Sequence, residues 1–268
     1  MTTTVLDSVL TDLLAESADL DDRVAGLDAA GWRLPTPAVG WTIAHQIAHL
    51  AWTDQAALLA IRDPEEFARH TAELWNAEAS PVDAAAEEGA VQPPAELLER
   101  WRTGRGRLRE ALLAIPPGGR IRWFGPPMSS ASMATARLME TWAHGHDVAD
   151  ALGQTPEPTD RVRHVCHLGV RTRDFSYAMR DLTPPAEPFR VELTGPSGER
   201  WTWGPVDAEQ SVAGDGYGFA LLATRRRHRA DVHVRAIGPD ADQWLDIVQA
   251  FAGPPGADPA RRRAEERP

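Results

Sequence analysis

The sequence predicts a mainly α-helical protein whose C-terminal part is of the α+β class. Through most of residues 1–153, apolar side chains recur at the three- and four-residue spacing of amphipathic helices, which indicates a helical bundle. Two short segments after residue 185 alternate apolar and polar side chains instead, as half-buried strands do. With 43% hydrophobic residues in 268, the chain can bury a substantial core.

Six helices are predicted in the first 180 residues, and several have a recognisable first turn. Thr42 follows the helix-breaking Pro35 and Pro37 and is placed to cap the second helix. Pro64 stands at a first helical position with two glutamates behind it, which favours a third helix. Segment 77–92 is weakly patterned, and no element is predicted there. The predicted helices cover about residues 4–27, 42–61, 64–75, 94–115, 131–152 and 161–180.

The C-terminal part predicts a hairpin followed by mixed elements. Residues 189–195 and 200–204 alternate apolar and polar side chains on either side of a Pro-Ser-Gly-Glu turn. A helix at about 217–224, a strand at 230–236 and a helix at 240–251 complete this part. We therefore predict a helical bundle over residues 1–153, a smaller α+β domain over 154–256 and a disordered tail over 257–268.

Charge and hydropathy exclude two classes of partner. The net charge of -11 argues against nucleic acid, whose binding depends on basic surface that releases counterions. No apolar run approaches the length of a membrane span, and the first residues lack the basic and apolar regions of a secretory signal. We predict a cytoplasmic protein with a small-molecule substrate, no membrane contact, and a monomeric or homodimeric state.

The basic and sulfur-containing residues exclude several mechanisms. The chain contains no lysine, which rules out Schiff-base, pyridoxal-phosphate and P-loop chemistry. Cys166 is the single cysteine, so neither an internal disulfide nor a cysteine zinc cluster can form. Cys166 lies in an apolar-periodic run and is expected to be a buried structural thiol. Any metal must therefore be held by histidine and carboxylate.

Two helical segments supply such ligands. Glu140 and His144 are four residues apart, so both side chains fall on one helix face, one turn apart. His45 and His49 have the same spacing on the second helix. His49 lies on the apolar side of that helix, where a buried imidazole needs a partner or a metal. We predict a metal site made of His49, Glu140 and His144.

Two imidazoles and one carboxylate suit a divalent ion such as zinc. They leave a fourth position open for water or a substrate atom, as in catalytic sites. His45 or His146 could supply a fourth ligand, a general base or part of the pocket wall. Asp147 or Asp150 could orient the ligand histidines, or could be solvated surface charges.

Other residues are candidates for contact with substrate or thiol. Arg171 and Arg173 could clamp a carboxylate, although a solvated helix face would look the same in the sequence. Trp41, Trp52 and Trp142 lie near the predicted ligands and are expected to wall the metal pocket, Trp142 as a substrate or thiol contact.

The two ligand-bearing segments resemble a known family. GWTIAHQIAHL at 40–50 and ETWAHGHD at 140–147 are similar to the DinB-like superfamily, and more closely to its mycothiol-dependent maleylpyruvate isomerase branch. Within that branch, the chain looks most like an uncharacterised metal-binding subfamily of actinobacterial type. The resemblance covers nearly the whole chain, including 163–173 and 244–256.

This resemblance implies a four-helix bundle with a smaller α+β domain. It also implies a zinc-like metal held by His49, Glu140 and His144, and mycothiol as cosubstrate. In such enzymes the metal binds the thiol sulfur, lowers its pKa and presents a thiolate to an electrophile. For an isomerase, the thiolate adds to a conjugated double bond, rotation follows, and elimination regenerates the thiol; a transferase keeps the adduct. His45 and His146 depart from the family pattern, and could close the open coordination position or shuttle protons.

The leading hypothesis is a metal-dependent enzyme that activates mycothiol for isomerisation of, or conjugation to, a small electrophilic metabolite. A second hypothesis is that the protein is a hydrolase or lyase that uses metal-bound water, with His45 or His146 as base. A third is a metal-binding or sensing protein without turnover, which would have a coordinatively closed site. A requirement for added thiol separates the first hypothesis from the other two.

Overall fold

The chain divides into two compact units, Met1–Pro156 and Glu157–Pro268. The long helices that bear the predicted ligands belong to the first unit, and a four-stranded sheet belongs to the second. The computed structural model describes residues 4–75, 80–256 and 258–261.

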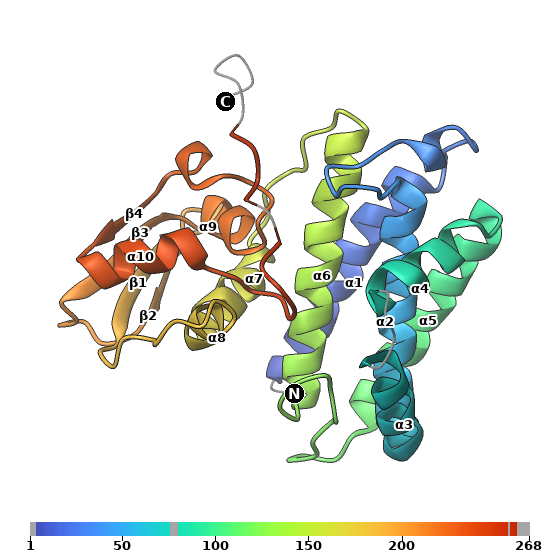
Figure 1. Cartoon of the computed structure of the whole chain (residues 1–268), viewed down its shortest axis with the longest axis horizontal. Helices are drawn as coiled ribbons and strands as arrows, with labels where there is room; N and C mark the ends of the chain where they lie inside the picture. The colour runs from blue at the N-terminus through green and yellow to red at the C-terminus, as the bar shows by residue number, and fades with distance from the viewer. Residues whose placement is uncertain (1–3, 76–79, 257, 262–268) are drawn as a thin grey trace. The chain divides into compact units, whose positions relative to one another are not determined.

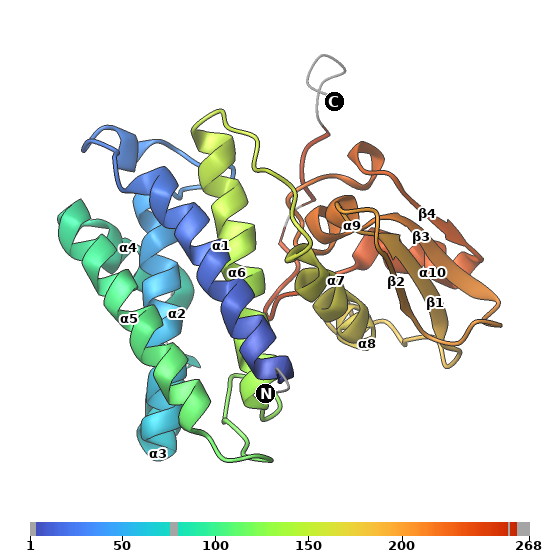
Figure 2. The ribbon, with the colours of Figure 1, turned by 180° about the vertical axis from the view of Figure 1, so that it is seen from behind.

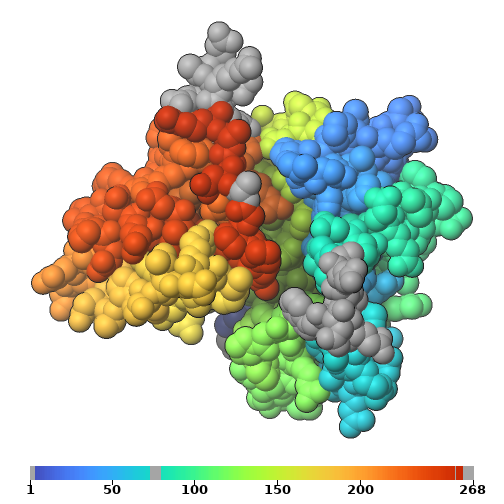
Figure 3. All heavy atoms as spheres, in the orientation of Figure 1, coloured from blue at the N-terminus to red at the C-terminus, as the bar shows by residue number. Residues whose placement is uncertain are grey.

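Four long helices form a bundle in the first unit, with two shorter helices beside them. The helices are α1 (Val5–Val24), α2 (Ile43–Arg62), α3 (Pro64–Trp75), α4 (Pro81–Ala90), α5 (Pro94–Ala114) and α6 (Ser130–Ala151). Helix α1 packs against α6 and α2 packs against α5, while α2 also contacts α6 (Figures 1 and 2). Helix α4 lies over α2 on the face shown in Figure 3. The predicted mainly α fold with a four-helix bundle is thus confirmed.

Helix α4 lies in segment 77–92, for which the sequence predicted no helix or strand. Ser80 accepts a hydrogen bond from the Asp83 N–H at its start, and Pro81 occupies the first turn. The buried residues of α4, Ala86 and Gly89, are both small. Its sequence therefore shows little contrast between buried and exposed faces, and packing against α2 selects the helix.

The start of α2 sets the register of its histidines. Thr42 caps the helix, as predicted, in a capping box whose third residue is His45 instead of the usual glutamate or glutamine. The Thr42 N–H donates to Nδ1 of His45 at 3.2 Å. Because the helix begins at Ile43, His49 lies in its second turn.

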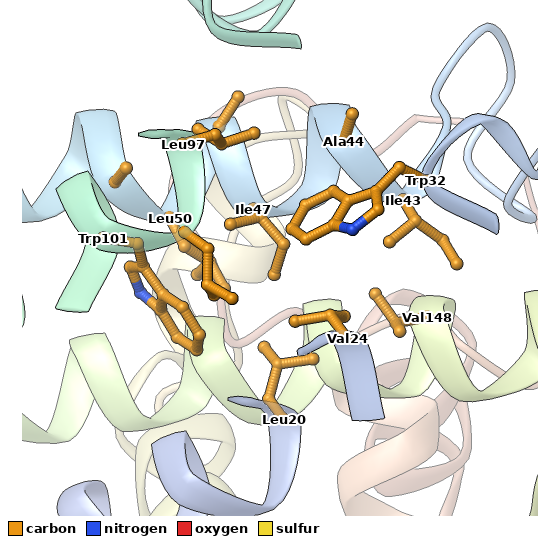
Figure 4. Packing of buried hydrophobic residues seen from close by; sticks show 13 residues of the cluster. Leu20, Val24, Trp32, Ile43, Ala44, Ile47, Leu50, Leu97, Trp101 and Val148 are labelled. Carbon is orange, nitrogen blue, oxygen red and sulfur yellow. The ribbon is translucent and has the colours of Figure 1, made fainter. Parts of the chain in front are cut away.

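A buried cluster in the bundle fixes the rotation of the ligand-bearing helices. Figure 4 shows Leu20 and Val24 of α1 meeting Ile47 of α2, Trp101 of α5 and Val148 of α6. All five side chains are at most 2% exposed. Burial of this set turns one face of α2 and one face of α6 toward the core, which determines where their other side chains point.

The second unit carries a four-stranded sheet in the order β2-β1-β3-β4. Strands β1 and β2 form the predicted antiparallel hairpin, β1 and β3 run parallel, and β3 and β4 run antiparallel. The elements are α7 (Val162–Arg171), α8 (Arg173–Ala178), β1 (Phe189–Thr194), β2 (Arg200–Trp203), β3 (Gln210–Asp215), α9 (Gly216–Ala223), β4 (Val234–Ile237) and α10 (Pro239–Ile247).

Three sequence predictions in this unit need correction. The helix predicted to run to residue 180 is divided at Thr172 into α7 and α8. Strand β3 was not predicted, because Val212 is its only buried residue. The strand predicted at 230–236 begins later, at Val234, since Arg229–Asp231 forms a 3-10 turn.

None of the described helices is both long enough and apolar enough to span a membrane. The cytoplasmic location and the monomeric or homodimeric state stay predictions. Of the tail predicted to be disordered, residues 257 and 262–268 lie outside the described part of the chain.

Candidate metal centre

The structure brings His49 of α2 together with Glu140 and His144 of α6. One ligand-type atom from each residue lies within 4.8 Å of the other two. Oε2 of Glu140 is 3.3 Å from Nε2 of His49 and 3.2 Å from Nε2 of His144. Neighbouring ligands of a tetrahedral zinc ion, each about 2.0–2.1 Å from the metal, lie roughly 3.3 Å apart. The spacing of these side chains therefore fits a small divalent ion.

A chain of hydrogen bonds fixes the proton on His144. The Thr36 hydroxyl donates to the Trp41 carbonyl at 2.9 Å, so its oxygen is free to accept from Nε2 of Gln46, at 2.8 Å. This orientation of the Gln46 amide turns Oε1 toward Nδ1 of His144. Because an amide oxygen only accepts, Nδ1 of His144 carries the proton.

The fixed proton position has a consequence for the cluster. In neutral His144, Nε2 presents a lone pair to the carboxylate oxygen of Glu140, and two acceptors repel unless a cation lies between them. That cation is either a second proton on His144 or a metal ion. The same Glu140 oxygen also faces Nε2 of His49, so one ion could satisfy all three atoms. The donor set thus fits a metal ligand cluster.

Glu140 is held in its charged form. Burial by itself raises the pKa of this carboxyl. When Nε2 of His144 and of His49 carries a proton, hydrogen bonds from both imidazoles and the charge of Arg137 hold the pKa well below its usual range. The ionised carboxylate is the form that binds metal. Glu140 is therefore prepared as a ligand at neutral pH.

Two tryptophans wall the cluster, as predicted. The Trp41 ring lies 5.4 Å from the ring of His49 and 6.0 Å from that of His144, nearly parallel to the latter. The Trp52 ring lies 6.2 Å from His49. Nε1 of Trp41 donates to Asp83 of α4 at 3.0 Å, which holds the indole in place. These rings pack against both ligand histidines and limit the room in which the imidazoles can rotate.

His45 and His146 lie outside the cluster. Nδ1 of His45 is used in the cap of α2, and its Nε2 lies 2.7 Å from Oε2 of Glu87 on α4. His146 follows His144 by two residues and so projects from another side of α6, where its Nδ1 donates to the Trp142 carbonyl at 2.7 Å. Neither imidazole contributes an atom to the three-residue cluster, so neither closes its fourth position.

Trp142, predicted as a substrate or thiol contact, is 3% exposed and packs on the ring of His146 at 4.0 Å. Asp147, predicted to orient a ligand, is buried with Oδ2 3.8 Å from Nδ1 of His144. Gln46 is the nearer partner of that nitrogen. The sequence signal for Gln46 was available: a glutamine three residues before His49 in an otherwise apolar helix segment.

The two predicted anion-clamping arginines belong to the second unit. Arg171 is exposed at the end of α7. Arg173 donates to the Glu187 carbonyl at 2.8 Å, the Pro185 carbonyl at 3.1 Å and Asp174 at 2.7 Å. Its guanidinium therefore ties the segment before β1 to α8. A role of either arginine in binding substrate stays a prediction.

Cys166 is confirmed as a buried structural thiol. It is fully buried, and its Sγ donates to the Gly216 carbonyl at 3.1 Å. Burial raises the pKa of this thiol, which suppresses the thiolate that a nucleophile needs. A reactive thiol would have to come from a cosubstrate.

Comparison with known proteins places this cluster in a family. Residues 13–149, about half of the chain, match the family described as the mycothiol maleylpyruvate isomerase N-terminal domain. The chain belongs to this family. Residues 185–236 match a second family, described as wyosine base formation. The resemblance inferred from the ligand-bearing segments is therefore confirmed.

Two relatives of this mycothiol maleylpyruvate isomerase family member come from Mycobacterium tuberculosis. Uncharacterized proteins Rv0036c and MT0041 are each 59% identical to it over 245 residues, which covers 91% of this chain and 95% of the relative. The crystal structure of a mycothiol-dependent maleylpyruvate isomerase matches with a TM-score of 0.60 at 19% identity, covering 90% of this chain and 98% of the other. A mutant of that enzyme matches with a TM-score of 0.59. The chain therefore shares the fold of that enzyme.

A second buried carboxyl, Asp54, lies near the cluster on α2. It is 7% exposed and lines a cavity of about 200 Å³ together with Thr141 of α6. Burial raises its pKa to about 7, against the opposing charges of Arg137 and Arg105. Asp54 and Glu140 thus share one bundle but respond oppositely to burial, because only Glu140 is hydrogen-bonded to imidazoles.

We expect Gln46→Leu to weaken metal binding by about 10- to 100-fold, because it removes the acceptor that orients His144. Gln46→Glu keeps an acceptor at that position and should retain tight binding. The same substitution at an exposed glutamine of α2, Gln55→Leu, is the matched control. The measurement is zinc affinity by competition with a chromogenic chelator. Wild-type affinity in a folded Gln46→Leu variant would contradict the assigned role.

We expect Asp54→Asn to stabilise the metal-free protein increasingly as pH rises. A raised pKa means that the folded state keeps the proton of Asp54 to a higher pH than the unfolded state does. The stability cost of Asp54 therefore grows from about pH 4 to about pH 7 and stays constant above that. At about 1.4 kcal/mol per pKa unit, the advantage of the asparagine variant should grow by about 2–3 kcal/mol from pH 5 to pH 8. Denaturant unfolding with chelator present measures this, with the exposed Asp22→Asn as control. An advantage independent of pH would refute it.

Proposed function

We propose that this protein is a divalent-metal-dependent enzyme that activates mycothiol for isomerisation of, or conjugation to, a small electrophilic metabolite. The observation that supports it most is the cluster of His49, Glu140 and His144, in which Gln46 directs the lone pair of His144 inward. We propose zinc as the metal, because two imidazoles and one carboxylate with an open fourth position are typical of zinc enzymes.

Different residues of the chain have different roles in this site. His49 and His144 present Nε2, and Glu140 supplies one negative charge. A divalent ion bound there would supply the Lewis acidity that lowers the pKa of a thiol. Trp41 and Trp52 pack against the ring of His49 and form an apolar side of the site. The protein itself brings no usable thiol to the first unit, since its single cysteine, Cys166, belongs to the second.

Mycothiol is proposed from the relatives. The matching family and the matching crystal structure are both described by mycothiol and maleylpyruvate isomerase, and the latter covers nearly the whole chain. The close relatives from Mycobacterium tuberculosis are uncharacterised, so they support the family without naming an electrophile. We therefore propose the thiol and the reaction class, and leave the metabolite as a small electrophile.

The ligand assignment predicts metal loss in three variants. His49→Ala, Glu140→Ala and His144→Ala should each fall well below one metal ion per chain after reconstitution with zinc and desalting, because two ligands bind zinc far more weakly than three. The exposed His70→Ala should retain wild-type metal content. Elemental analysis of the four proteins gives the answer. Full metal in all three ligand variants would remove the basis of the proposed function.

The thiol assignment predicts that zinc-loaded protein binds mycothiol and that metal-free protein does not. Binding should release a proton, because the thiolate is the form that a metal stabilises. Calorimetry in two buffers of different ionisation enthalpy measures both, with S-methyl mycothiol as the control ligand that cannot form a thiolate. Bound zinc without mycothiol binding would favour a hydrolase, a lyase or a sensor instead.

A further inference from the structure

A buried arginine beside the metal cluster has two nitrogen atoms without hydrogen-bond partners among the residues that the structure describes. Arg137 lies on α6 one turn before Glu140 and is 5% exposed. Its Nε and Nη1 are buried, and neither has a hydrogen-bond partner within the described part of the chain. Buried guanidinium groups are normally paired, because desolvating their charge and their N–H donors is costly.

The two nearby acids do not satisfy this guanidinium. Arg137 lowers the pKa of both Glu140 and Asp54, so its charge acts on each. Neither acid forms an ion pair with it, however, among the pairs found within the described residues. Glu140 is turned to the two histidines, and Asp54, with its pKa raised to about 7, is only partly ionised at neutral pH. The charge of Arg137 is thus balanced at a distance, while its Nε and Nη1 have no hydrogen-bond partner among the described residues.

Aromatic rings connect Arg137 to the metal cluster. Its guanidinium carbon lies 5.5 Å from the centre of the Trp123 ring. Trp123 contacts Phe124 at 4.7 Å, and Phe124 contacts Trp52 at 6.3 Å between ring centres. Trp52 in turn contacts the ligand His49. Arg137 therefore lies at one end of a row of aromatic side chains whose other end contacts the ligand His49.

We propose that Arg137 binds a carboxylate group of the substrate at the metal centre. This rests on the proposed function, since it makes the electrophile a small carboxylic acid. Nε and Nη1 of Arg137 can each donate to a carboxylate oxygen, and the incoming charge would complete the balance of a buried cation. The neighbouring Glu140 and Asp54 disfavour a group that itself carries two negative charges, so a carboxylate group, which carries one, fits better than a phosphate.

The test uses zinc-loaded full-length protein and small conjugated acids as probes. Fumarate and maleate are titrated by calorimetry, with fumaramide, maleamide and inorganic phosphate as comparison ligands. We expect Arg137→Met to weaken binding of the better carboxylate by about 10- to 100-fold, because a charge-assisted contact is lost, with zinc content and diamide binding unchanged. Arg122→Met removes the same charge from an exposed position in the neighbouring loop and should change little.

Arg137→Lys keeps the charge but lacks the guanidinium donors. This variant provides the test if Arg137→Met fails to fold or loses zinc. An intermediate loss of carboxylate affinity in the lysine variant supports the proposal. Carboxylate affinity equal to wild type in either folded, zinc-loaded variant overturns it, as does equal binding of acids and diamides by the wild type. Stronger binding of phosphate than of carboxylates also overturns it. Failure of the zinc-loaded protein to bind mycothiol would contradict the proposed function but would leave the measured preference for carboxylates unchanged.

Discussion

The hydrogen-bond chain that ends at His144 determines what the centre can hold. It begins in the loop before α2, where the backbone N–H and the hydroxyl of Thr36 both donate to the Trp41 carbonyl. It passes through Gln46, which is fully buried, and ends on Nδ1 of His144. One loop, the first turn of α2 and the middle of α6 are thereby joined. Without this chain, the imidazole could present a proton to Glu140 instead of a lone pair.

Local sequence signals predicted most of the bundle because they act over one or two turns. The Thr42 cap and the proline at the start of α3 are read from neighbours in sequence, and both begin helices where expected. Elements that depend on distant partners were missed. Helix α4 has only small buried residues, and β3 buries only Val212, so neither has an apolar pattern of its own. Packing on α2 and pairing with β1 and β4 supply what their sequences lack.

In the site, too, features set by local spacing were predicted and features set by distant contacts were not. Glu140 and His144 share a helix, so their spacing alone places them together, and the apolar surroundings of His49 marked it as the third member. His45 has the same four-residue spacing from His49, but it is used as a helix cap, and His146, two residues from His144, projects from a different side of α6. Which face of each helix points into the bundle is set by core packing and cannot be taken from spacing within one helix. Gln46 was visible as a polar residue near His49, but its role as an acceptor depends on His144 of a second helix.

Burial by itself raises the pKa of both carboxyl groups in this part of the bundle, Glu140 and Asp54, and their different partners determine whether each stays ionised. Glu140 stays ionised because two imidazoles and a guanidinium face it, whereas Asp54 lacks such hydrogen bonds and gains affinity for its proton. The centre thus holds one negative charge, on Glu140, where a metal cation fits, and a turn away the cation of Arg137, two of whose nitrogens lack hydrogen-bond partners among the described residues. A substrate that carries both an electrophilic carbon and a carboxylate would meet complementary charge at two points. Two such points would fix its orientation, which one metal contact cannot do.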